Sequence, residues 1–170
     1  MPMIPFVEKF PELGVRETRS VRSMGRDDLP DGEYAFLELY CNEPGCDCRR
    51  VTIDVLRPET GWNKIWATIS YGWESAAFYR RWGGRHSDPV EMKGPVLDTL
   101  NPQSRYSAVL LDLFRLLIES PEYVQRLEGH YRMFRAVVDK EHAERECQAE
   151  QRVANRRKRL RDPSRRGKRR

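Results

Sequence analysis

The chain is predicted to adopt an α+β fold, in which an antiparallel β-meander of three or four strands packs against a helical hairpin. Alternating apolar patterns joined by short turns occupy residues 34–71. Helical periodicity with proline start signals occupies residues 101–160. Three cysteines within residues 41–48 place a metal-binding hairpin inside the meander. The length of 170 residues allows one compact domain and an appendage.

The first 33 residues are expected to form an irregular N-terminal segment. They are rich in proline, glycine and charge, with little periodicity. Only residues 16–22 fit an edge strand. The sequence Leu-Pro-Asp-Gly at residues 29–32 is a turn signal, and it introduces the first clear strand.

Three runs of alternating residues are expected to form the meander, over residues 34–41, 50–56 and 64–71. In the second run Val51, Ile53 and Val55 are expected to point inward, because polar residues alternate with them. The carboxylates of these strands, Glu38 and Asp54, are interpreted as solvated side chains.

The second half of the chain has helical periodicity. A short helix over residues 75–82 is expected to end at two glycines. Asn101-Pro102 and Ser120-Pro121 each resemble a helix start, which predicts a helical hairpin. Residues 136–160 lack glycine and proline, so the last helix is expected to run beyond the core. The predicted division is therefore 1–33 (irregular), 34–138 (metal-binding α+β domain) and 139–170 (extended helix and basic tail).

Cys41, Cys46 and Cys48 are the strongest candidates for a functional site. Pro44-Gly45 turns the backbone between them, so that their sulfurs can converge. Thiolates supplied by a tight turn suit Zn²⁺, which they bind at about 2.3 Å in a tetrahedral arrangement. The spacing C-x₄-C-x-C differs from the common finger spacings, and reduced or redox-active thiols are the alternative.

A structural zinc site needs a fourth ligand. His130 is the preferred candidate, because it lies on the apolar stripe of the last helix and is expected to face the interior. His86, in a glycine-rich loop, and Cys147 are alternatives. His142 is expected to be too distant. A water molecule in the fourth position would instead make the site open.

The sequence contains few signs of catalysis. It has no H-E-x-x-H, no phosphate-binding glycine loop and no G-x-S-x-G. Whether the protein is an enzyme is left open, with a non-catalytic binding module preferred. The alternative is a hydrolase-like enzyme whose open zinc site activates a water.

The basic charge is concentrated in the tail. The whole chain has 31 basic and 26 acidic residues, and residues 151–170 hold eleven of the basic residues and one of the acidic ones. Residues 1–150 therefore have a net charge of −5. Such a tail is expected to contact RNA, DNA or the ribosome without sequence preference, the alternative being a solubilising tail. The residues concerned are Arg156, Arg157, Lys158, Arg159, Arg161, Arg165 and Arg166.

Aromatic residues are frequent between residues 62 and 82, with arginines nearby. They could form a stacking platform for single-stranded nucleic acid. A core seam, where the third strand meets the short helix, is the preferred interpretation.

No run of about 18 apolar residues occurs, so no membrane span is expected. No secretory signal is recognisable at the N-terminus. We expect a cytoplasmic protein, in whose reducing surroundings clustered cysteines bind metal.

Residues 29–56 contain Tyr40-Cys41, an acidic Pro-Gly turn and the string Cys46-Asp47-Cys48-Arg49-Arg50, and His130-Tyr131 follows on a later helix. With these features the chain resembles a family of uncharacterised bacterial proteins, some of them associated with SEC-C-type zinc-binding proteins. The resemblance implies metal binding and no particular activity.

Overall fold

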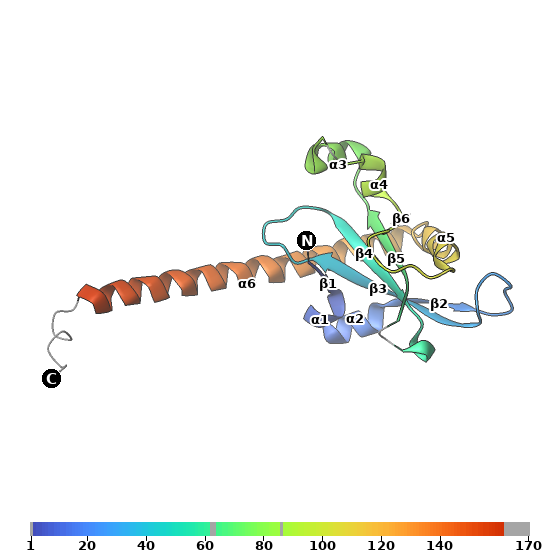
Figure 1. Cartoon of the computed structure of the whole chain (residues 1–170), viewed down its shortest axis with the longest axis horizontal. Helices are drawn as coiled ribbons and strands as arrows, with labels where there is room; N and C mark the ends of the chain where they lie inside the picture. Colours follow the sequence, from blue (N-terminus) through green and yellow to red (C-terminus); the bar gives the residue numbers. More distant parts are fainter. Residues whose placement is uncertain (1, 62–63, 86, 162–170) are drawn as a thin grey trace.

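The computed structural model describes residues 2–61, 64–85 and 87–161 (Figure 1). It confirms the α+β class: over these residues six antiparallel strands form one sheet, and helices pack against it. The strand order is β1-β3-β4-β5-β6, and β2 also pairs with β3. Both short N-terminal strands therefore share the edge of β3 that lies opposite β4.

The predicted meander forms the centre of the sheet. Its strands are β3 (Gly32–Cys41), β4 (Arg50–Leu56) and β5 (Ile65–Gly72). Ile53 of β4 pairs with Glu38 on one side and with Ile69 on the other. The inward direction predicted for Val51, Ile53 and Val55 is confirmed, since all three are fully buried.

One face of β3 differs from the expectation. Tyr34, Phe36 and Tyr40 are fully buried, and Glu38, which lies between them, is buried as well. The prediction of a solvated Glu38 is wrong, because partners inside the protein replace water. Tyr40 donates a hydrogen bond to its carboxylate at 2.9 Å, and His130 contacts it at 2.7 Å.

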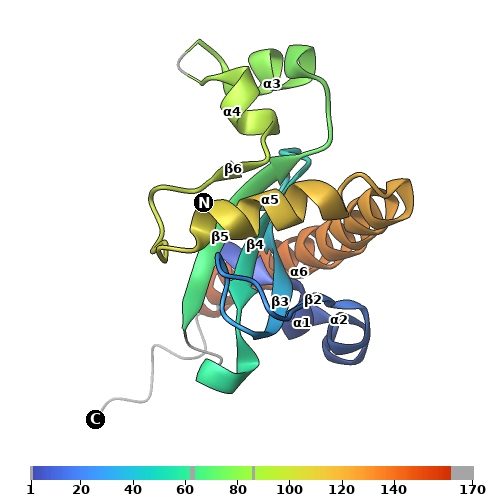
Figure 2. The same cartoon turned by 90° about the vertical axis from the view of Figure 1, so that its right-hand side faces the viewer.

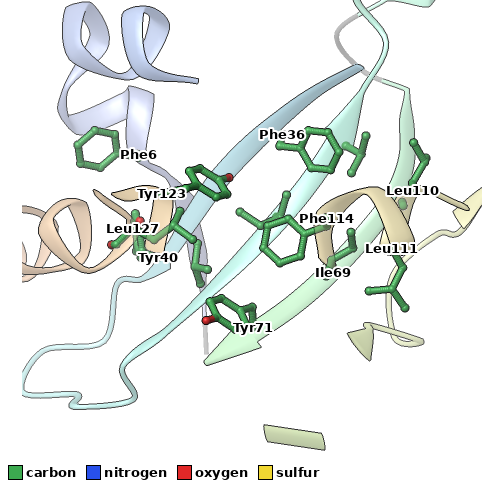
Figure 3. Close-up of a cluster of buried hydrophobic side chains, with 14 of the residues drawn as sticks. Phe6, Phe36, Tyr40, Ile69, Tyr71, Leu110, Leu111, Phe114, Tyr123 and Leu127 are labelled. Carbon is green, nitrogen blue, oxygen red and sulfur yellow. The ribbon is translucent and has the colours of Figure 1, made fainter. Parts of the chain in front are cut away.

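The helical hairpin covers this aromatic face (Figure 3). It consists of α5 (Ser107–Leu117) and α6 (Pro121–Arg161). Phe114 of α5 stacks against Phe36, and Phe134 of α6 packs against Tyr40. Both helices therefore bury their apolar sides on the same face of the sheet.

The start of α5 was predicted five residues too early, at Asn101-Pro102. The chain here continues along the edge of β5. The Gln103 side-chain amide donates to the carbonyl oxygen of Thr68 at 2.9 Å, and its oxygen accepts from the Thr68 amide at 3.2 Å. These bonds hold residues 101–104 to the sheet, so the helix begins later.

The N-terminal segment is not irregular. It forms β1 (Met3–Pro5), α1 (Phe6–Lys9), α2 (Pro11–Glu17) and β2 (Arg19–Ser23). Both strands gain their backbone partners from β3, and Phe6 anchors the segment in the core. β2 overlaps the edge strand that was expected over residues 16–22. β1 and the two helices were not predicted, because β1 depends on pairing with the distant β3.

The remaining elements are a 3-10 turn (Pro58–Thr60), α3 (Ala76–Gly83), α4 (Pro89–Lys93) and β6 (Val96–Leu97). Figure 2 shows α3 and α4 beyond one end of the sheet, above β6. The short helix predicted over residues 75–82 is confirmed, and Ser75 caps it by accepting from the Phe78 amide. Trp66, Tyr71 and Tyr79 are buried, as expected for a core seam.

Candidate metal centre

Cys41, Cys46 and Cys48 lie close enough together to hold one metal ion. Their Sγ atoms are all within 4.8 Å of one another. Cys41 ends β3, and the other two lie in the loop that leads to β4. Cys41 and Cys48 are 1% and 4% exposed, whereas Cys46 is partly exposed. The predicted convergence of the three sulfurs is therefore confirmed.

The backbone of the loop between Cys41 and Arg50 explains this convergence. The Cys46 amide donates to the carbonyl oxygen of Glu43 at 3.2 Å, which closes a turn around Pro44-Gly45. Gly45 has a φ of +69°, a left-handed conformation that glycine adopts without strain. The turn folds Cys46 back toward the end of β3.

Helix α6 holds this loop from one side. The Arg135 Nη1 atom donates to the carbonyl oxygens of Cys41 at 3.0 Å and Glu43 at 2.8 Å. One turn later, the Asp139 carboxylate accepts from the Gly45 amide at 3.0 Å and also pairs with Arg135. Tyr131, one turn earlier, contacts the Cys46 carbonyl oxygen through its hydroxyl at 3.4 Å. Three successive turns of one helix thus support the loop.

Helix α3 holds the other end of the loop. The Tyr79 hydroxyl donates to the carbonyl oxygen of Arg49 at 2.7 Å. The Arg49 guanidinium pairs with Asp47 at 2.9 Å and Glu74 at 2.8 Å, and it lies over the ring of Phe78. Arg49 is therefore occupied by carboxylates rather than by the thiols.

The three thiols differ in pKa: that of Cys41 is lowered, and those of Cys46 and Cys48 are raised. A hydrogen bond from Cys48 is the main cause that lowers the pKa of Cys41 to about 6, and the Glu43 amide and Arg135 add to it. The pKa of Cys48 is raised by the hydrogen bond that Cys48 makes to Cys41 and by burial. The pKa of Cys46 is raised by burial. One thiolate is thus favoured over three. A divalent cation would supply the positive charge needed to ionise the other two.

A cavity of about 240 Å³ adjoins Cys41 and Cys48. Arg50 and Trp82 help to line it, and the Arg50 Nη2 atom donates to the Ser70 hydroxyl at 3.0 Å. Arg50 has no carboxylate partner within the part of the chain that the structure describes. Arg50 therefore brings a positive charge to the cavity that Cys41 and Cys48 also line.

His130 lies elsewhere. Its Nδ1 atom contacts Glu38 at 2.7 Å, its Nε2 atom contacts Glu17 at 3.1 Å, and its ring stacks on Phe6 at 4.1 Å. The prediction of an inward-facing histidine is correct. However, both ring nitrogens are engaged by carboxylates, and the structure does not bring His130 into the cysteine cluster.

The other candidates for the fourth ligand differ in position. His142 and Cys147 lie on the outer part of α6, where Cys147 is exposed and His142 pairs with Glu146 at 3.4 Å. His86 lies outside the described residues.

Sequence reasoning missed Arg135 and Asp139 and their contact with the loop. With Tyr131 they occur at i, i+4 and i+8, so they share one face of α6. The signal available in the sequence was an arginine directly after Phe134, a position of the apolar stripe. The structure shows that this arginine is buried.

Five of the seven residues predicted to contact nucleic acid lie at the far end of α6. Arg156 is exposed. Arg157, Lys158, Arg159 and Arg161 belong to the same helix, whereas Arg165 and Arg166 lie outside the described residues. Among the described helices, none is both long and apolar enough to cross a membrane.

Comparisons of this chain with family models, curated proteins and solved structures found no match. The resemblance of residues 29–56 to a bacterial zinc-binding family therefore stays a prediction.

Proposed function

We propose that this protein is a small cytoplasmic zinc-binding module in which the metal stabilises the fold and does not catalyse a reaction. The main support for this proposal is that three cysteine Sγ atoms lie within 4.8 Å of one another, in a loop that two helices hold by hydrogen bonds. A metal bound there would join β3, β4 and the loop between them. Its binding free energy would then contribute to folding.

Zinc is the proposed metal because the donors are soft and anionic. Three thiolates select zinc over magnesium or calcium, which prefer oxygen ligands. With one neutral fourth ligand, the centre would have a net charge of −1. The guanidinium of Arg50, in the adjoining cavity, would offset that charge.

His86 is proposed as the fourth ligand in place of His130. Both nitrogens of His130 already have carboxylate partners. Trp82 lines the cavity beside Cys41 and Cys48, and it precedes His86 by four residues. Four residues of chain span at most about 14 Å, which is the reason to test His86 before His142 and Cys147.

Cobalt substitution tests the ligand set. Co²⁺ bound by three thiolates and an imidazole is expected to give intense sulfur-to-cobalt charge-transfer bands and tetrahedral d–d bands. Cys48→Ser should weaken the charge-transfer bands, and His86→Ala should shift the d–d bands. His130→Ala and Cys147→Ser serve as controls and should leave both unchanged. If His130→Ala, rather than His86→Ala, shifts the bands, the assignment of the fourth ligand is wrong.

An enzyme with an open zinc site is the second candidate, and the cavity of about 240 Å³ beside Cys41 and Cys48 favours it. A water in the fourth position could then act as a nucleophile. Azide added to the cobalt form distinguishes the two. It changes the d–d bands of an open site, and it leaves a site with four protein ligands unchanged.

We also propose that residues 151–170 contact RNA, DNA or the ribosome. The support is their charge, together with the exposure of Arg152 and Arg156 on α6. Binding should weaken steeply with salt, because Lys and Arg side chains displace counterions from phosphates. A chain that ends at residue 150 should lose this binding and keep its metal. Equal binding by the truncated chain would contradict the proposal.

A further inference from the structure

Helix α6 leaves the domain and continues alone. Lys9 still pairs with Glu141 at 2.7 Å, but every side chain from Ala143 to Arg156 is exposed. From Ala143 to Arg161 the helix is about 28 Å long, at 1.5 Å per residue. Figure 1 shows this outer part of α6 extending away from the sheet with no other element beside it.

The charges of this outer helix are separated along its length. Residues 139–150 contain five acidic and two basic side chains, a net charge of −3. Residues 151–161 contain six basic side chains and no acidic one, a net charge of +6. The helix therefore has an acidic half and a basic half, which we define by these two ranges.

The two halves are neutralised unequally. In the acidic half, Asp139 pairs with Arg135, Glu141 with Lys9 and Glu144 with Lys140, and Glu146 contacts His142. Among the described residues, Glu150 of the acidic half and Arg152 and Arg156 of the basic half have no ion pair. Glu146 and Glu150 are like charges at i,i+4, and so are Arg152 and Arg156. Like charges at this spacing destabilise an isolated helix. A helix that is polar on all sides needs compensating charges or a partner.

We propose that α6 of a second copy of this chain is that partner. Two copies would pair side by side in antiparallel orientation, about a twofold axis near residue 151. The acidic half of each helix would then lie along the basic half of the other. This is an isologous contact, in which one surface serves both copies.

The side chains along α6 permit such a contact. Ala143, Cys147 and Ala154 lie on one face of the helix, since their spacings of four and seven residues are close to whole turns. Their small size lets two helices approach closely. Because the domains would lie at opposite ends of the paired helices, they would not collide. This inference does not depend on the metal centre.

The test is the mass of the full-length, metal-loaded and nuclease-treated chain in sedimentation equilibrium. At about 50 mM salt the expected mass is twice that of one chain, which is 20.1 kDa. At about 500 mM salt the affinity should fall at least about tenfold, because screening weakens contacts between exposed charges. A single-chain mass under both conditions would overturn the proposal.

Charge-reversal variants distinguish this specific pairing of helices from non-specific association. Glu144→Arg with Glu150→Arg should give a monomer, and so should Lys158→Glu with Arg161→Glu, two positions on the same side of α6 as Ala143, Cys147 and Ala154. The chain with all four substitutions should regain the dimer, since its halves are again complementary. Arg80→Glu with Arg81→Glu, on the exposed side of α3, is the matched control and should remain dimeric. A dimer that survives either two-residue reversal, or a four-residue chain that stays monomeric, would overturn the proposal.

Cysteine cross-linking tests the orientation. Around an axis at residue 151, the two copies of Cys147 would lie about 12 Å apart along the helices, too far for a disulfide. Oxidation should therefore not link Cys147, whereas Gln151→Cys in a Cys147→Ser background should link readily. A Cys147 disulfide, which a parallel pair would form, would contradict the antiparallel arrangement.

Discussion

Replacement of Arg135 by methionine is expected to weaken metal binding by about 100-fold while leaving the sheet folded. Arg135 is 7% exposed, and its Nη1 atom donates to two carbonyl oxygens of the cysteine loop. Methionine keeps much of the apolar length of the side chain but removes both hydrogen bonds. The Asp139 carboxylate, which also accepts from the Gly45 amide, loses its guanidinium partner as well.

The magnitude follows from these contacts. A hydrogen bond from a charged group contributes about 1.5–3 kcal/mol, and the two from Nη1 share one guanidinium and are not fully additive. A combined loss of about 3 kcal/mol corresponds to a factor of about 100 in the dissociation constant. The loss should appear in metal affinity, because these bonds order the loop that carries Cys41 and Cys46.

The assay is competition for Zn²⁺ with a chromophoric chelator at fixed pH. Arg132→Met is the matched control, because Arg132 lies on the same helix one turn earlier and is exposed. Arg135→Lys should give an intermediate loss, since an ammonium retains the charge without the planar geometry of the guanidinium. An Arg135→Met protein that binds zinc as tightly as the Arg132→Met control would refute the idea that α6 organises the site.

Two further perturbations test the surroundings of the site. Burial tends to lower the pKa of His130, but Glu38 and Glu17 outweigh it and raise this pKa above 6.5. The stabilisation from charged His130 should therefore be complete at a pH below the pKa of His130 in the unfolded chain. It should be lost as the pH rises through the higher pKa of His130 in the folded protein. Urea unfolding of the wild type and of His130→Gln across this range should give free energies that converge at high pH; a constant difference would contradict the assignment. Gly72→Ala should lower the melting temperature, with a cost of about 1–3 kcal/mol, because an added Cβ would lie 2.2 Å from the Tyr79 hydroxyl. If the melting temperature is unchanged, the contact between β5 and α3 is not as close as described.

The central strands could be predicted because apolar and polar residues alternate along each of them, and this alternation alone indicates which side chains are buried. Val51, Ile53 and Val55 needed no knowledge of their neighbours to be assigned to the core. The three cysteines could be predicted as one site for a similar reason. Their convergence depends on a local turn, and the eight residues 41–48 contain both the turn and the three cysteines.

The errors concern residues whose environment is set by distant parts of the chain. Glu38 appeared to be a solvated carboxylate because its partner, His130, lies 92 residues away. The same contact explains why His130, although correctly placed facing inward, engages Glu38 and Glu17 instead of the thiols. Strand β1 was missed because it is three residues long and depends on the edge of β3 for its hydrogen bonds, whereas β2 overlaps the edge strand expected over residues 16–22.

The metal content of the purified chain, measured together with its melting temperature, tests the proposed zinc site most directly. Protein purified without added metal is expected to contain about one zinc ion per chain, and a strong chelator should lower its melting temperature substantially. Cys48→Ser should lose most of the zinc, whereas Cys147→Ser should retain it. A chain that contains no zinc, and whose melting temperature is unchanged by the chelator, would contradict a structural zinc site.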